Sequence, residues 1–191
     1  MISMDQELLR RTIAMVSPMS DEVWVASAGF FKPKTLRKKE FFLRQGEVCK
    51  YIGFVQKGYT RLFYNLAQEE VTKDFNTEGS FCGSYASFIT NTPARFNVVA
   101  MEPLELLLIS KENLLNLTEQ YMPWQKFLRI AMEGMFIAKE NRETLFLTAT
   151  PEERYLELLQ RRPDWVKRIP LKYLASYLGM APETLSRIRA R

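Results

Sequence analysis

The sequence predicts an α+β protein, in which a β-rich middle segment that folds as a compact barrel or sandwich lies between two helical segments. Residues 32–109 hold short runs of β-branched and aromatic residues separated by glycines, which is typical of short strands and turns. The residues before and after them show apolar side chains at helical spacing. The charge is uneven as well, because residues 151–191 hold nine Lys and Arg against five Asp and Glu and so carry most of the net charge of +5. Such a segment is typical of a module that contacts phosphates, although a basic segment that only aids solubility is about as common.

The bulk composition is that of a soluble globular protein with one large domain or two small ones. The chain has 191 residues, of which 47% are hydrophobic and 26% are charged. No stretch comes near the roughly 18 consecutive apolar residues that a membrane span needs, and the first residues lack the apolar core of a secretory signal. The two cysteines, Cys49 and Cys82, lack CxxC spacing. We therefore expect a cytoplasmic protein without a disulfide framework and without a membrane partner.

The missing residue types narrow the chemistry. The sequence has no histidine, which excludes a Ser-His-Asp or Cys-His hydrolase and a His-ligated zinc or haem site. Two cysteines cannot supply the four thiolates of an ordinary iron–sulfur cluster within one chain. Carboxylate catalysis would need a pair of acids, and no pair stands out from the solvated background. We expect the protein to be neither an enzyme nor the carrier of a cofactor.

Two helices are expected before the β-rich segment. Leu8, Leu9, Ile13 and Val16 fall on one face of the first helix, and Ser20 is placed to begin the second.

Glycine turns divide the β-rich segment into strands. Its first three runs are separated at Gln45-Gly46 and at Lys57-Gly58. Alternating side chains over residues 60–64 predict a half-buried strand. Further strands are expected in "VTKDFNTEGSFCGS" and in "RFNVVAMEPLELLLIS".

A long helix is expected from Pro123 to Pro151, after a short helix that Ser110 caps. Residues along it recur at spacings of three and four, which is the seam of a two-stranded coiled coil. These residues are Phe127, Ile130, Gly134, Ile137, Asn141, Thr144 and Thr148. The alternative is a helix packed only against its own barrel. Other apolar residues lie on neighbouring faces, so we favour a helix that contacts the barrel on one side and a second copy of the chain on the other.

The pattern of the last segment predicts a helix-turn-helix. Residues 152–165 are expected to form one helix, followed by a short turn. In "LKYLASYLGMAPETLSRIRAR", Gly179 can end the next helix with positive φ, and Pro182 stands where another helix would begin. Ala175 is small where two helices should cross. This spacing is typical of a DNA-binding helix-turn-helix.

The exposed face of the last helix is predicted to carry the DNA contacts. Its residues are Glu183, Thr184, Ser186, Arg187 and Arg191, which can bind base edges or phosphates. Lys172, Lys167 and Arg168 lie nearby and could neutralise phosphates. The alternative is a helical hairpin with a polar face that binds no nucleic acid.

The order of these parts resembles the Crp/Fnr superfamily of bacterial transcription regulators over nearly the whole chain. "LRQGE", "VQKGYTRLF" and "EGSFCGS" look like the turns of that family's β-roll, and "GMAPETLSRI" looks like its recognition-helix signature. The resemblance implies a cyclic-nucleotide-binding-like β-roll (residues 1–122), a dimerisation helix (123–150) and a helix-turn-helix domain (151–191). It also implies a homodimer that binds double-stranded DNA, works with RNA polymerase and responds to a small-molecule effector.

Besides the missing cysteine and histidine ligands of the family's cluster and haem sensors, two departures from the family are visible. In members that bind cyclic AMP, a glutamate holds the ribose and an arginine holds the phosphate; Ser84 takes the place of that glutamate, and Arg95 is shifted by one residue. We therefore predict that cyclic AMP does not bind tightly, and that Gly83, Ser84 and Arg95 either hold another ligand or line a pocket filled by side chains. The second departure is the short linker at residues 161–169 and the end of the sequence at Arg191, which predict a reduced or missing β-hairpin wing.

Overall fold

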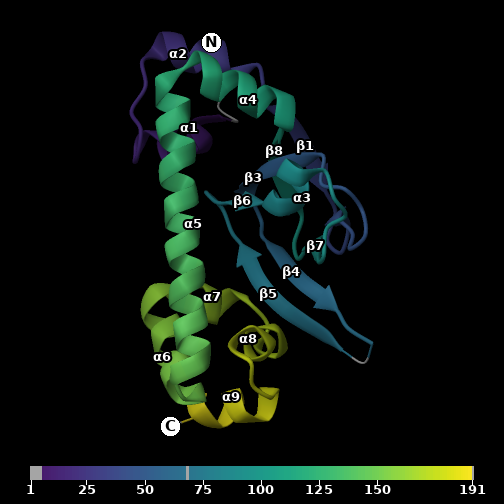
Figure 1. Cartoon of the computed structure of the whole chain (residues 1–191). Helices are drawn as coiled ribbons and strands as arrows, with labels where there is room; N and C mark the ends of the chain where they lie inside the picture. Colours follow the sequence, from purple (N-terminus) through teal and green to yellow (C-terminus); the bar gives the residue numbers. More distant parts are fainter. Residues whose placement is uncertain (1–5, 68, 191) are drawn as a thin grey trace.

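Helices at both ends of the chain enclose a β-roll of two antiparallel sheets (Figure 1). The computed structural model describes residues 6–67 and 69–190. The strand order is β1-β8-β3-β6 in one sheet and β2-β7-β4-β5 in the other. The strands are β1 (Lys32–Leu36), β2 (Phe41–Leu43), β3 (Tyr51–Lys57), β4 (Thr60–Asn65), β5 (Glu70–Asn76), β6 (Phe81–Cys82), β7 (Asn97–Ala100) and β8 (Leu104–Ser110). The predicted α+β class and the β-roll are confirmed.

The turn between β3 and β4 shows why a glycine is required there. Gly58 has a φ of +83°, and a Cβ at this position would lie 2.5 Å from the carbonyl oxygen of Pro103. Only glycine fits a backbone of this conformation and such a close approach. The predicted break at Lys57-Gly58 is therefore confirmed.

Strand β4 is not the half-buried strand that its alternation predicts. Its residues from Thr60 to Phe63 are all buried, because the face outside the roll's core is covered by the C-terminal helices. Arg61 is only 3% exposed, and its guanidinium lies 4.2 Å from the ring centre of Tyr173. The alternation predicted a solvent-facing side that the fold covers with another segment of the same chain.

The N-terminal helices pack as predicted. In α1 (Glu7–Ala14), Leu9 and Ile13 are fully buried, and α2 (Asp21–Ala28) begins where Ser20 Oγ accepts a hydrogen bond from Val23 N. Ser27 of α2 accepts a 2.7 Å hydrogen bond from Trp124 Nε1. This bond joins the N-terminal helices to the beginning of the long helix.

One short helix was not expected from the sequence. The helix α3 (Tyr85–Thr90) begins at Ser84, whose Oγ accepts from Ser87 N, and it ends at Asn91 in the left-handed region. A six-residue helix is too short to show helical periodicity, and its aromatic and β-branched residues favour strands. The helix α4 (Lys111–Gln120) does begin at Ser110, as predicted.

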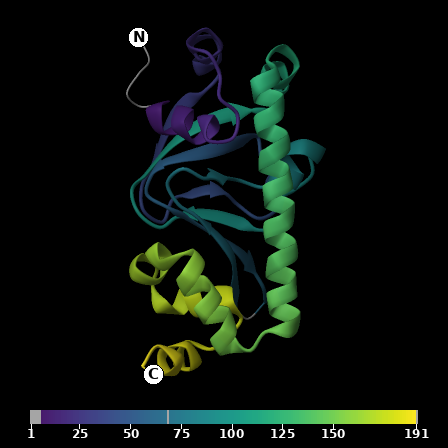
Figure 2. The ribbon, with the colours of Figure 1, turned by 90° about the vertical axis from the view of Figure 1, so that its left-hand side faces the viewer.

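The long helix α5 (Met122–Thr148) links the two ends of the molecule. Figures 1 and 2 show it running beside the roll and down to the C-terminal helices. Trp124 and Phe127 near its start are buried in the core of the roll. With 27 residues it is about 40 Å long at 1.5 Å per residue.

The C-terminal segment is entirely helical in the part that the structure describes. It contains α6 (Pro151–Arg161), α7 (Pro163–Arg168), α8 (Leu171–Leu178) and α9 (Pro182–Arg189). The prediction of one helix over residues 152–165 is wrong, because Pro163 disfavours a helical backbone at Arg162, where φ is −138° and ψ is 61°. The linker at residues 161–169, for which the sequence predicts only a short turn, therefore contains α7. No strand occurs among described residues 149–190.

Candidate nucleic-acid interface

The helices α8 and α9, which the sequence predicts as a helix-turn-helix, are joined by a tight turn at residues 179–181. Gly179 ends α8 in the left-handed region, with φ +65° and ψ +45°, as predicted. The N–H of Met180 donates to the carbonyl of Ala175 at 3.0 Å, which closes the end of α8. Pro182 occupies the first turn of α9, where its missing N–H leaves no donor unpaired.

The two helices are held together by a small apolar core. Leu174, Ala175 and Leu178 from α8 are buried against Leu185 from α9, and Ile188 packs on the same cluster. Because these side chains all point inward, the opposite face of α9 is left to solvent.

The predicted DNA-reading residues lie on this outer face. Glu183, Ser186 and Arg187 are exposed and Thr184 is partly exposed. The helix lies at the end of the molecule opposite the N-terminus (Figure 1). Lys172, at the start of α8, is exposed as well, whereas Arg191 falls outside the described residues. An arginine on such a face can donate two hydrogen bonds to one guanine, and a glutamate can accept a hydrogen bond from the amino group of cytosine.

Arg168, in contrast, does not point to a free surface. Its guanidinium donates to both carboxylate oxygens of Glu78, at 2.7 and 2.9 Å, and to both of Glu102, at 3.1 and 2.5 Å. These hydrogen bonds raise the pKa of Arg168. Burial alone would raise the pKa of Glu78, but the hydrogen bonds from Arg168 and from Gly58 N outweigh it and the pKa is lowered. The expected phosphate contact from Arg168 is therefore replaced by a contact with the roll.

The end of α5 contacts α8 and the turn that follows it, which sequence reasoning did not predict. Arg142 Nη2 donates to the carbonyl of Tyr177 at 3.0 Å, and its guanidinium lies 4.1 Å from the centre of the Tyr177 ring. Phe146 lies so close to Gly179 that a Cβ there would be 2.7 Å from Phe146 Cε1. Gly179 is thus required for its backbone conformation, and any larger residue there would also displace the Phe146 ring.

An ionisable group lies near the same contact. Burial raises the pKa of Asp74, although a hydrogen bond from Phe75 N and the positive charges of Lys73, Arg142 and Arg162 oppose the rise. Burial likewise raises the pKa of the Tyr177 hydroxyl, and the nearby Asp74 carboxylate adds to it.

The predicted ligand pocket is closed around Ser84. This residue is 3% exposed, its N–H donates to Cys49 Sγ at 3.4 Å, and its Oγ accepts from Ser87 N at 3.5 Å. A Cβ on Gly83 would lie 2.9 Å from Ile52 Cδ1, so this backbone is tightly packed. Arg95, by contrast, is exposed, on the loop before β7.

The residues of the predicted coiled-coil seam divide into two groups. Phe127 is 7% exposed because it packs inside its own roll against Trp124 and Phe81. Ile130 is partly buried, and from Gly134 onward the seam is exposed in the single chain, as Ile137 is 55% exposed. Gly134 and Asn141 are exposed too. The free face therefore begins two seam positions later than the sequence pattern indicated.

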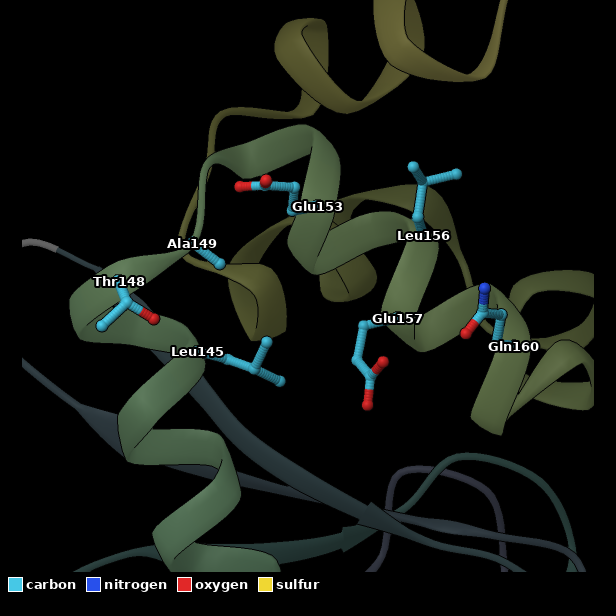
Figure 3. Close-up of a pocket in the computed structure, with 7 residues that line it drawn as sticks. All are labelled: Leu145, Thr148, Ala149, Glu153, Leu156, Glu157 and Gln160. Carbon is cyan, nitrogen blue, oxygen red and sulfur yellow. The ribbon is translucent and has the colours of Figure 1, made fainter.

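A depression of about 380 Å³ lies between the end of α5 and α6 (Figure 3). Leu145, Thr148 and Ala149 line one side of it, and the other side comes from α6: Glu153, Leu156, Glu157 and Gln160. Thr148 belongs to the predicted seam, so the depression continues that face.

No group of three or more His, Cys, Asp or Glu side chains among the described residues could hold a metal ion. No helix in the part of the chain that the structure describes is long and apolar enough to cross a membrane.

Comparison with known proteins identifies the roll and the overall architecture. Residues 33–121 match the cyclic nucleotide-binding domain family, whereas no curated protein sequence matches the chain. Among solved structures, the chain is similar to the catabolite activator protein of Thermus thermophilus (20% identity, 94% of this chain and 85% of that chain, TM-score 0.60). It is similar to FixK2 of Bradyrhizobium japonicum (20%, 84% and 83%, TM-score 0.70).

A third similar structure is the c-di-GMP-responsive global regulator CLP of Xanthomonas campestris (14% identity, 90% of each chain, TM-score 0.69). All three likenesses extend well beyond the roll, into the helices that follow it. Residues 33–121 are therefore similar to the cyclic nucleotide-binding domain family, and the chain taken whole has the fold that these three proteins share.

Proposed function

We propose that the protein is a homodimeric transcription regulator that binds double-stranded DNA through α8 and α9 and acts on RNA polymerase. The observation that carries this proposal is the exposed outer face of α9, with Glu183, Ser186 and Arg187, on a helix-turn-helix whose apolar residues face inward. The likeness in fold to the catabolite activator protein, FixK2 and CLP supports a regulator rather than an enzyme. Two recognition helices of a dimer would enter successive major grooves roughly 34 Å apart.

A gel-shift titration with genomic DNA fragments at two salt concentrations tests this proposal. A regulator that neutralises phosphates must lose affinity steeply as salt rises. Dimerisation without salt-sensitive DNA binding would instead indicate a ligand-sensing or protein-interaction module whose helix-turn-helix is vestigial.

The dimer in this proposal forms along the free face of α5, from Gly134 to Asn141, with the partly buried Ile130 at its edge. Gly134→Ala distinguishes it from a monomer. A Cβ at Gly134 meets nothing within 4 Å in the single chain, so in a monomer alanine should stabilise the helix by about 0.5–1 kcal/mol. In a dimer whose helices approach closely at this glycine, the added methyl group should separate them and weaken association.

Sedimentation equilibrium of the parent and of Gly134→Ala measures this directly. We expect the dimer dissociation constant to rise about tenfold, which corresponds to about 1.4 kcal/mol. An unchanged constant together with a higher Tm would place the dimer contact elsewhere.

The effector in this proposal is either absent or a molecule other than cyclic AMP. The closed packing around Ser84 supports this, because its N–H and Oγ already bond to Cys49 and Ser87. A cyclic phosphate without a well-placed arginine would be costly to bury. Isothermal titration should show no binding of cyclic AMP at micromolar concentrations, and a micromolar or tighter dissociation constant would contradict the proposal.

A further inference from the structure

The roll holds α7 at both of its ends. At the start, Arg162 Nη2 donates to Thr77 Oγ1 at 2.9 Å. At the other end, the guanidinium of Arg168 is bound by the carboxylates of Glu78 and Glu102. Thr77 and Glu78 are consecutive residues of the turn after β5, and Glu102 lies in the turn between β7 and β8. We refer to Thr77, Glu78 and Glu102 as the α7 cradle.

Aromatic side chains fill the space between these two polar contacts. Trp165, in the middle of α7, is 4% exposed, and its ring meets that of Phe75 nearly at a right angle, with centroids 5.2 Å apart. Tyr177 of α8 contacts both rings, and Tyr59 of the roll joins the same cluster. The apolar core of the C-terminal helices is therefore completed by two aromatic residues of the roll.

This shared core has a physical reason. Segments of about 40 residues bury too little surface to be stable alone without disulfides, metals or a partner, and residues 151–190 are of that size. Strand β5 is also an edge of its sheet, and α8 packs along it. Ser176 Oγ accepts a 2.8 Å hydrogen bond from Thr72 N. The helix α8 thereby satisfies a backbone N–H of the edge strand β5 that would otherwise face solvent.

The α7 cradle is connected directly to the segments of the candidate ligand pocket. Glu78 precedes Gly83 by five residues, in the same segment as β6. Glu102 follows β7, the strand that begins just after Arg95. The residues that hold Arg168 are thus continuous in sequence with both pocket segments, and neither connection includes α5.

We infer that Thr77, Glu78 and Glu102 are positioning residues for DNA recognition, which fix the orientation of α8–α9 relative to the roll by holding α7. They also link the pocket segments to the DNA-reading helices by a route separate from the long helix. The part of this inference that concerns DNA rests on the proposed function, whereas the part that concerns orientation does not.

The test compares the double variant Glu78→Gln/Glu102→Gln with the control Glu40→Gln/Glu105→Gln. Glutamine keeps an oxygen that can accept from Gly58 N, so the variant mainly removes the two negative charges that face the Arg168 guanidinium. The control removes the same charge from roll glutamates that pair instead with Arg37 and Lys57.

The orientation of α8–α9 relative to the roll is measured by pulsed electron paramagnetic resonance. This gives the distance between spin labels attached at Lys34→Cys and Ser186→Cys of one chain. Labelled protein is diluted with unlabelled protein, so that distances between two copies do not contribute. The native Cys49 and Cys82 are buried and should stay unlabelled. We expect a narrow distance distribution in the parent and in the control, and a broader one in Glu78→Gln/Glu102→Gln. Equal widths in all three proteins would overturn the inference.

The DNA readout is the preference for half-site spacing. On DNA selected by the parent, Glu78→Gln/Glu102→Gln should discriminate about fivefold less than the parent does between the best half-site spacing and a spacing altered by a few base pairs. The expected effect is modest, because surface ion pairs contribute little energy each. Its base preference within a half-site should stay that of the parent. Unchanged spacing discrimination would count against the inference, whereas a parent that binds no DNA would contradict the proposed function and leave the distance measurement to decide.

Arg168→Gln provides a second variant that leaves the roll unchanged. It should broaden the distance distribution as much as the glutamate variant does, and combining the two should add little, since both remove the same interaction. Additive broadening would mean that the carboxylates and Arg168 do not act as one unit.

Discussion

Gly179→Val is expected to weaken DNA binding at least tenfold while the roll stays folded. Left-handed backbone costs a non-glycine residue about 1–2 kcal/mol, and a β-branched residue is strained further there. The new Cβ would also lie 2.7 Å from Phe146 Cε1. Either α8 and α9 lose their relative orientation or Phe146 must leave the turn, so the recognition face is no longer presented as a unit.

The measurement combines gel-shift titration with thermal unfolding followed by circular dichroism. We expect at least a tenfold loss of DNA affinity, which corresponds to about 1.4 kcal/mol. Gly29→Val is the matched control, because Gly29 has a φ of −67° and a Cβ there meets nothing within 4 Å. Equal DNA binding by the two variants would show that the turn at Gly179 does not set the recognition face.

Local rules of sequence were sufficient for most elements. The positions of Ser20 and Ser110 predicted two helix starts that the structure confirms with side-chain hydrogen bonds. Gly58 and Gly179 predicted turns, and both have positive φ. These predictions succeeded because a cap or a left-handed turn depends on the residue itself and on its near neighbours in the chain.

Predictions failed where one segment covers another that is distant in sequence. The outer face of β4 is buried since Tyr173 lies over Arg61, and Arg168 faces carboxylates 66 and 90 residues away. Basic residues in a basic segment predict phosphate contacts, and the neighbouring sequence gives no reason to assign Arg168 a different partner from Lys172. The pairing of Arg168 with Glu78 and Glu102 becomes visible only when the roll and α7 are placed side by side.

Arg187→Ala is expected to relax the sequence preference of DNA binding and to cost about 1–3 kcal/mol on the preferred site. The Arg187 side chain is exposed on the outer face of α9, one turn after Glu183, so in a major groove it would reach base edges. Removing a base contact should weaken binding to the preferred site and leave binding to random DNA nearly unchanged.

Arg189→Ala separates this effect from a simple loss of charge. Arg189 is also exposed, but it lies two residues further along α9 and therefore on a different face of the helix. Its removal should weaken binding to preferred and random DNA by similar factors, as expected for a phosphate contact. Competition gel shifts with both DNAs measure the ratio for each variant. If Arg187→Ala lowered both affinities by the same factor as Arg189→Ala does, then α9 would contact only the DNA backbone, and the bases would be read by another part of the protein.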